Sequence, residues 1–245
     1  MIPPRLIPIL LIDRDQRVVK TVQFGERTYI GDPFNIVRLF NEKQVDEICV
    51  LDIDASTDGR APNFELAAAL AAECFMPLSY GGGISTVEHA RKLIADGVEK
   101  LVLHAHIDDA LIEAIAWEFG TQCLVGCLDY QVVGGKRVTI PGQRSLEDEA
   151  VRLARAGAGE LILQSIDHDG GRNGMDIEGI MQIAPKSPIP VIALGGACEL
   201  ANMMDAVTAG ADAVASGSAF SFIGRLRAVL ISYPDYSERQ RALRR

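Results

Sequence analysis

Four glycine-rich segments of this chain have residue types that could hold a phosphate group. They read SYGGGIS from Ser79, DHDGGRNG from Asp167, IALGGAC from Ile192 and ASGSAF from Ala215. Glycine lets backbone N–H groups approach an anion closely, and the start of a following helix adds a favourable dipole. We therefore expect a phosphorylated small molecule to bind at these segments.

These segments predict one phosphate site in the second half of the chain. It is made of Asp169, Gly170, Gly196, Gly217 and Ser218. Within it, we expect Asp169 to orient loop N–H groups or a ligand hydroxyl rather than to touch phosphate. The alternative is that the glycines only form tight turns.

A second candidate phosphate site, made of Gly82, Gly83 and His104, lies in the first half of the chain. Its chemistry is weaker, because Ala105 lacks the hydroxyl that Ser218 supplies in the other site. His104 either contacts phosphate or is only a polar residue at the end of a strand. Two sites on opposite sides would suit a long substrate with a phosphate at each end.

Short apolar runs alternate with longer helical patterns along the whole chain. The predicted strands are 5–12, 47–53, 76–80, 99–105, 123–129, 160–166, 189–194 and 212–217. The predicted helices are 32–44, 63–74, 85–96, 108–119, 145–156, 175–184, 199–209 and 219–230. This alternation predicts a parallel sheet closed into a (β/α)8 barrel, with an open doubly wound sheet as the alternative. Trp117 is expected to pack inside, and the charged tail from Ser237 to be a solvated end.

An internal repeat favours the barrel over the open sheet. DEICVLDID from Asp46 matches GELILQSID from Gly159, and GVEKLVLHA from Gly97 matches GADAVASGS from Gly210. A constant spacing between equivalent elements indicates duplication. We therefore predict one domain over 1–245, built from half-barrels of about 1–120 and 121–245.

Composition excludes several classes of protein. The net charge of −9 argues against nucleic acid or an anionic membrane as the main partner. The five cysteines are scattered, and the histidines lack metal-ligand spacing, so we expect no disulfide framework, no metal and no cofactor. A reducing cytoplasm is the simplest setting.

Seven segments resemble the cyclase subunit of imidazole glycerol phosphate synthase and occur in the order of that family. They are RLIPILLIDRDQRVVKTVQF from Arg5, GDP from Gly31, VLDIDAS from Val50, YGGGIS from Tyr80, FGTQCLVGCLD from Phe119, SIDHDG from Ser165 and VIALGGA from Val191. The resemblance covers almost the whole chain. It implies a glutaminase partner, whose ammonia enters at the N-terminal face of the barrel. The ammonia then crosses the interior to a bis-phosphorylated ribulosyl substrate.

The resemblance also implies two catalytic aspartates, at the ends of strands 1 and 5, acting as general acid and base. The second is present as Asp129, but Leu11 occupies the position of the first. Removing a general acid or base costs about 10²–10⁴-fold in rate. Asp13 could substitute only if its loop bends back. Lys20 matches the family's lysine in the loop after strand 1, and His104 falls where the family usually has asparagine.

Four charged residues at the starts of strands resemble the family's salt-bridged ammonia gate. They are Arg5, Glu47, Lys100 and Glu160. Charge is not expected at the start of an apolar strand unless it is paired. Because side chains alternate along a strand, Arg5 and Leu11 would share one face of strand 1, which would run from the gate to the reaction mouth. The alternative is that these residues are solvated charges that only stabilise the barrel.

A retained gate with a missing acid–base partner resembles a paralogous branch of the family. That branch accompanies a glutaminase and a separate amidotransferase that modifies surface-polysaccharide sugars, and RAVLISYPDY from Arg227 is similar to it. We therefore expect an ammonia-channelling subunit of a glutamine-dependent amidotransferase system. The alternatives are a genuine cyclase (lyase) of histidine biosynthesis, and a related sugar-phosphate isomerase or binding barrel.

Overall fold

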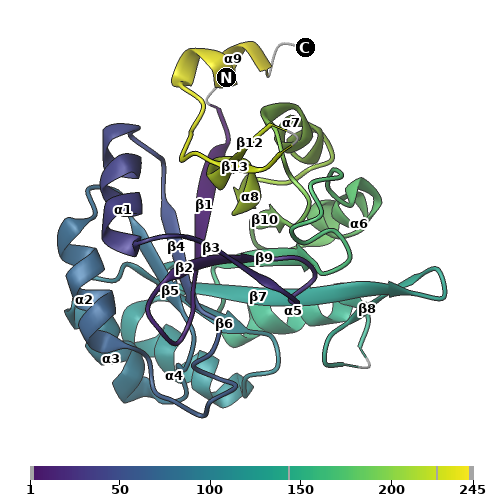
Figure 1. Ribbon diagram of the computed structural model, residues 1–245. Helices are drawn as coiled ribbons and strands as arrows, with labels where there is room; N and C mark the ends of the chain where they lie inside the picture. The colour runs from purple at the N-terminus through teal and green to yellow at the C-terminus, as the bar shows by residue number, and fades with distance from the viewer. Residues whose placement is uncertain (1–2, 143, 225, 243–245) are drawn as a thin grey trace.

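Eight parallel strands form a closed barrel in the computed structural model, which describes residues 3–142, 144–224 and 226–242 (Figure 1). Each strand pairs with the next around the ring, and the last pairs with the first, with Arg5 opposite Ala213. The strands are β1 (Arg5–Ile12), β4 (Ile48–Asp52), β5 (Leu78–Gly81), β6 (Lys100–His104), β7 (Leu124–Val133), β9 (Glu160–Ser165), β10 (Val191–Leu194) and β11 (Ala213–Ser216). The predicted (β/α)8 barrel is confirmed.

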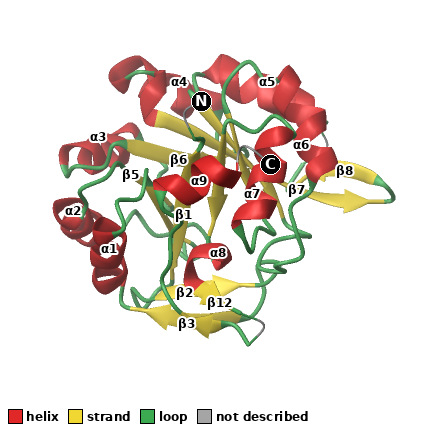
Figure 2. Ribbon diagram, turned by 90° about the horizontal axis from the view of Figure 1, so that it is seen from above, coloured by secondary structure: helices red, strands yellow, loops and turns green. Residues whose placement is uncertain are grey.

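Seven helices of ordinary length surround the barrel in the part of the chain described (Figure 2). They are α1 (Pro33–Glu42), α2 (Phe64–Glu73), α3 (Val87–Ala95), α4 (Asp109–Phe119), α5 (Leu146–Ala156), α6 (Ile177–Ile183) and α7 (Leu200–Thr208), with 3₁₀ turns η1 (Thr121–Cys123) and η2 (Ala184–Lys186). Polar side chains such as Asp32 and Ser145 begin six of these helices by accepting a backbone N–H bond. Such caps satisfy donors that the first turn leaves unpaired.

The predicted eighth helix, 219–230, is wrong. A single helical turn, α8 (Ser218–Ser221), is followed by a small hairpin of β12 (Phe222–Ile223) and β13 (Ala228–Val229). Gly224 and Arg227 both have positive φ, which a right-handed helix does not allow. The hairpin and an extended segment therefore lie where a longer helix was expected.

Two further hairpins extend the strands beyond the ring, and the sequence pattern did not predict them. β2 (Val18–Thr21) pairs with β3 (Arg27–Gly31) in the loop after β1. The far end of β7 continues past the barrel and pairs with β8 (Lys136–Thr139) as a projecting arm (Figures 1 and 2). The first hairpin matters for function, because it carries Lys20 to the C-terminal mouth.

The chain ends in helix α9 (Tyr236–Ala242), which lies at the N-terminal end of the barrel near the start of β1 (Figure 1). Arg239 is buried and its Nη1 lies 2.5 Å from Asp46 Oδ2, while the Tyr233 hydroxyl donates to the carbonyl of Leu6. The expectation of a solvated tail from Ser237 is therefore wrong for Arg239, whereas Ser237, Glu238 and Arg241 are exposed, and 243–245 lie outside the described residues. Trp117 is also not packed inside, because 92% of it is exposed.

Apolar side chains form two separate cores on the two faces of the strands. The outer core lies between the strands and the helices, and the inner core fills the barrel. Ile7, Ile9 and Leu11 belong to the inner core, as the alternation along strand 1 predicted. The lower and upper ends of this inner face carry the charged and polar residues of the candidate site.

Candidate functional site

A cavity of about 500 Å³ opens at the C-terminal end of the barrel. The loops that follow β1, β4, β5, β6, β9 and β11 form its wall, which is where active sites lie in this fold. Nine residues predicted from the sequence line it: Leu11, Lys20, Gly82, Gly83, His104, Asp129, Asp169, Gly217 and Ser218. The fold thus brings both candidate phosphate sites and Asp129 to one space.

Gly170 and Gly196 were predicted as phosphate-site residues but are not among the residues that line this cavity. Both have positive φ, and a Cβ would clash with the carbonyl of Thr21 at Gly170 and with that of Gly174 at Gly196. Close packing of neighbouring loops therefore explains why glycine stands at both positions.

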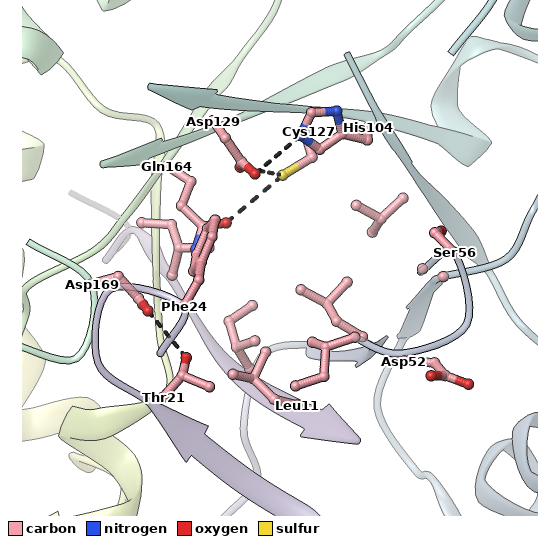
Figure 3. A pocket seen from close by; sticks show the side chains of 18 of the residues that line it. Leu11, Thr21, Phe24, Asp52, Ser56, His104, Cys127, Asp129, Gln164 and Asp169 are labelled. Carbon is pink, nitrogen blue, oxygen red and sulfur yellow. Dashed lines mark hydrogen bonds and ion pairs between the residues drawn. The ribbon is translucent and has the colours of Figure 1, made fainter. Parts of the chain in front are cut away.

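Asp129 lies on β7, and Leu11 lies across the cavity from it (Figure 3). Asp13 is buried but binds Arg17 in its own loop, with Arg17 Nη2 2.9 Å from Asp13 Oδ2. Burial alone would raise the pKa of Asp13, but hydrogen bonds from Arg17 outweigh it and lower this pKa. Asp13 therefore does not replace the missing partner of Asp129.

Two other carboxylates line the cavity, and each is engaged elsewhere. Asp52 Oδ1 accepts the backbone N–H of Ala55 at 2.9 Å and lies close to Arg60. Asp169 Oδ2 accepts from the Thr21 hydroxyl at 3.3 Å (Figure 3). The polar side chain that the structure places beside Asp129 is a histidine instead.

His104, which was predicted for the second phosphate site, contacts Asp129. Its Nε2 is 3.0 Å from Asp129 Oδ2, because residues 104 and 127 are register partners on the neighbouring strands β6 and β7 (Figure 3). The Sγ of Cys127 lies 3.5 Å from the other carboxylate oxygen, Oδ1. Asp129 is thus held from both sides within the cavity wall.

Lys20 reaches into the cavity from β2 and is buried there. Its Nζ donates to the carbonyl of Ile9, and burial lowers the pKa of Lys20 to about 8, against the opposing charge of Asp169. Burial raises the pKa of Asp169, while Lys20 and the Thr21 hydroxyl act in the opposite direction. This side of the cavity therefore combines an amine with Gly217 and Ser218 at the start of α8.

The opposite wall carries Gly82 and Gly83, both with positive φ. A Cβ on Gly82 would clash with the carbonyl of Asp52, so the backbone passes too close for a side chain. The N–H of Gly83 is 3.3 Å from the Ser56 hydroxyl, which also lines the cavity. The second candidate phosphate site thus includes a hydroxyl, supplied by Ser56 rather than at position 105.

Among the cavity residues that sequence reasoning missed are Phe24, His106, Cys127 and Gln164. Two of these residues could have been found from their spacing. Cys127 lies two residues before Asp129 on the same strand and therefore on the same face, and His106 lies two residues after His104. Phe24 could not be found in this way, because it reaches the cavity only through the hairpin of β2 and β3 (Figure 3).

The four predicted gate residues form a closed ring of ion pairs at the N-terminal end of the barrel. Arg5 binds Glu47 at 2.8 Å and Glu160 at 2.5 Å, and Lys100 Nζ lies 2.9 Å from each of the two glutamates. Burial would raise the pKa of Glu160, but hydrogen bonds from Lys100 and Arg5 outweigh it and lower this pKa. The four side chains thus form one closed cycle of ion pairs.

A small void of about 10 Å³ lies inside the barrel between the ring and the cavity. Glu47 and Ser79 provide its polar lining, and the remaining lining residues are apolar or cysteine. A space of this size holds roughly one water-sized molecule. Ile9 and Val102 line both the void and the large cavity, so the two spaces adjoin.

Known proteins similar to this chain share its length. The profile of a family described as histidine biosynthesis protein matches residues 5–226. A Pseudomonas aeruginosa protein with the provisional name imidazole glycerol phosphate synthase subunit hisF2 is 47% identical over 248 residues, covering 97% of this chain and 98% of that protein. A Leptospira borgpetersenii protein, provisionally named subunit HisF, is 40% identical over 254 residues, covering 98% of each. Imidazole glycerol phosphate synthase subunit HisF of Geobacillus kaustophilus is 37% identical over 248 residues, covering 94% of this chain and 97% of that protein.

Proposed function

Because the chain belongs to the histidine biosynthesis protein family, we propose that it is a cyclase-type subunit that pairs with a glutaminase and conducts ammonia through its barrel. The ammonia serves the amidation of a surface-polysaccharide sugar by a separate amidotransferase, in the cytoplasm. Within the described residues, no helix has the length and apolar character needed to cross a membrane.

The observation that carries this proposal is the presence of all four ring residues together with a leucine at position 11 of the cavity. The ring of Arg5, Glu47, Lys100 and Glu160 lies next to a small void, and Ile9 and Val102 line both this void and the cavity. At the far end, Leu11 presents a hydrocarbon side chain to the cavity where the family resemblance calls for a carboxylate. These two features support a chain that conducts a small neutral molecule but lacks one of the two carboxylates that the family resemblance implies for cyclisation.

The test combines two assays on the same purified chain. Co-expression with a glutaminase subunit should give a complex in which glutamine hydrolysis is faster than in the glutaminase alone. With ammonium chloride in place of glutamine, the chain should not consume the bis-phosphorylated ribulosyl substrate. Consumption at the rate of an ordinary cyclase would contradict the proposal.

A genuine cyclase of histidine biosynthesis is the second candidate. One contact favours it: His104 Nε2 lies 3.0 Å from Asp129 Oδ2, so Asp129 has a neighbour that can exchange a proton. The ammonium chloride assay separates the two functions, because only a cyclase releases an aminoimidazole ribotide as product.

The two glycine-lined walls of the cavity are proposed to bind phosphate groups. Lys20, Gly217 and Ser218 would hold one group, and Gly82 and Gly83 the other. Titration with a sugar bisphosphate and with the matching monophosphate tests this arrangement. Equal affinity for the two compounds would contradict the use of both walls.

A further inference from the structure

Asp129, His104 and His106 form a continuous chain of polar contacts from the cavity wall to its rim. His104 Nε2 lies 3.0 Å from Asp129 Oδ2, and His104 Nδ1 lies 2.5 Å from His106 Nδ1. The two imidazole rings have their centroids 4.4 Å apart and are tilted by 47°. Asp129 is buried, whereas His106 is exposed, so the chain connects an interior carboxylate with solvent.

The backbone fixes the direction of these hydrogen bonds. The N–H of His106, which can only donate, lies 3.2 Å from His104 Nδ1. Nδ1 of His104 is therefore the acceptor, and the proton of the neutral ring is on Nε2, from where it is donated to Asp129. The close contact between the two Nδ1 atoms then requires His106 to carry its proton on Nδ1. This leaves Nε2 of His106 free to accept a proton.

We propose that these three residues form a proton relay that connects Asp129 with solvent. A hydronium ion from solvent protonates Nε2 of His106 and leaves as water, and the proton on Nδ1 of His106 passes to Nδ1 of His104. The Nε2 proton of His104 then passes to Asp129 Oδ2. Each ring gains one proton and loses one, so both rings end as the opposite tautomers, and the reverse passage restores them and returns the proton from Asp129 to solvent.

The surroundings of the relay suit this role. Burial, and then the neighbouring His104, lower the pKa of His106, while Asp129 acts in the opposite direction. His106 is therefore neutral at neutral pH. At the inner end, Cys127 Sγ lies 3.5 Å from Asp129 Oδ1 and Gln164 Oε1 lies 3.9 Å from the same sulfur.

The relay does not depend on the proposed function, because Asp129, His104 and His106 alone define it.

Imidazole ¹⁵N NMR spectra of the full chain test the relay without any ligand. The chain has four histidines, so His89 and His168 serve as internal references. At neutral pH we expect His104 to carry its proton on Nε2 and His106 to carry its proton on Nδ1. In Asp129→Asn, the ¹⁵N shifts of His106 should also change, although His106 reaches Asp129 only through His104.

The transfer step is tested by the exchange of the His104 Nε2 proton with water. In His106→Phe, this exchange should slow by about 10²-fold, which is the lower end of what a positioned proton-transfer group contributes. Asp52→Asn is the matched control, because it removes a carboxylate from the same cavity without touching either ring. It should leave both proton positions and the exchange rate unchanged.

Three results would overturn the relay: a proton on Nδ1 of His104, a proton on Nε2 of His106, or an exchange rate that His106→Phe does not change. None of them bears on whether ammonia passes through the barrel. Conversely, a chain that fails to stimulate a glutaminase but shows the expected spectra and exchange would support the relay and contradict only the proposed function.

Discussion

The ammonium group of Lys20 lies in the space that a side chain at position 217 would take. A Cβ added to Gly217 would clash with Lys20 Nζ and then with Cε and Cδ of the same chain. Lys20 is held there by its bond to the carbonyl of Ile9. The loop after β1 and the loop after β11 therefore depend on each other at this point.

We predict that Gly217→Ala displaces the Lys20 amine from its bond to Ile9. Overpacking of this kind costs typically about 1–3 kcal/mol, and the free energy of unfolding in urea should fall by such an amount. Binding of inorganic phosphate should weaken in parallel. In the double variant Lys20→Ala with Gly217→Ala, stability should recover but phosphate binding should not. A stable Gly217→Ala chain with unchanged phosphate affinity would contradict the arrangement.

A second prediction concerns the pH dependence that Lys20 gives to stability. Burial lowers its pKa from 10.5 to about 8 in the folded chain. Between these two values the unfolded chain binds more protons at this site than the folded chain, so stability rises with pH over this window. In Lys20→Met this contribution is absent. Urea unfolding of both chains from pH 7 to pH 10.5 should show the difference between them shrinking as the pH increases.

The ring at the barrel floor should be sensitive to the loss of one charge. Glu47 is buried and accepts from Arg5, Lys100 and the Ser79 hydroxyl. In Glu47→Gln the two cations keep only Glu160, and breaking a buried pair in this way costs about 3–5 kcal/mol. The exposed pair of Arg38 and Glu73 gives the control: Glu73→Gln should change stability by no more than about 1 kcal/mol. Equal effects in thermal unfolding would show that the ring is an ordinary surface cluster.

Leu11→Asp should give the chain cyclase activity or raise a weak one. The new carboxylate would face Asp129 across the cavity and restore the pair that the family resemblance implies. The expected gain is about 10²–10⁴-fold in the rate of substrate consumption with ammonium chloride. Asp13→Asn is the control, because this carboxylate binds Arg17 outside the cavity and should not affect the rate. Should Asp13→Asn lower the activity of the Leu11→Asp chain, our account of position 11 would be incomplete.

The barrel and its ring could be predicted from the sequence because they follow from alternation and spacing. Arg5 and Leu11 share one face of β1, and Glu47 and Glu160 take equivalent places in the two halves, so their positions follow from the repeat. Leu11 could be recognised as a departure from the expected aspartate because it aligns with Asp129 in the repeat. These features depend on local pattern and on the closure of the sheet.

The features that were missed depend on conformations that no periodicity encodes. The predicted helix over 219–230 ends after one turn because Gly224 and Arg227 have positive φ, and an Arg in that conformation gives no signal in the sequence. The contact between His104 and Asp129 depends on the register of β6 against β7, which the apolar runs left undetermined. Phe24 reaches the cavity through a hairpin that replaces a simple loop.

The covering segment after β11 has a consequence for the place where the barrel closes. The sheet closes between β11 and β1, and beyond β11 the structure has the single turn α8, the hairpin of β12 and β13, and an extended segment ending at Tyr233. This covering segment has fewer backbone hydrogen bonds within any one element than a long helix would have. The free energy of local opening is lowest where the packed elements are least cooperative. We therefore expect β1 and β11 to separate locally more often than the other neighbouring strands.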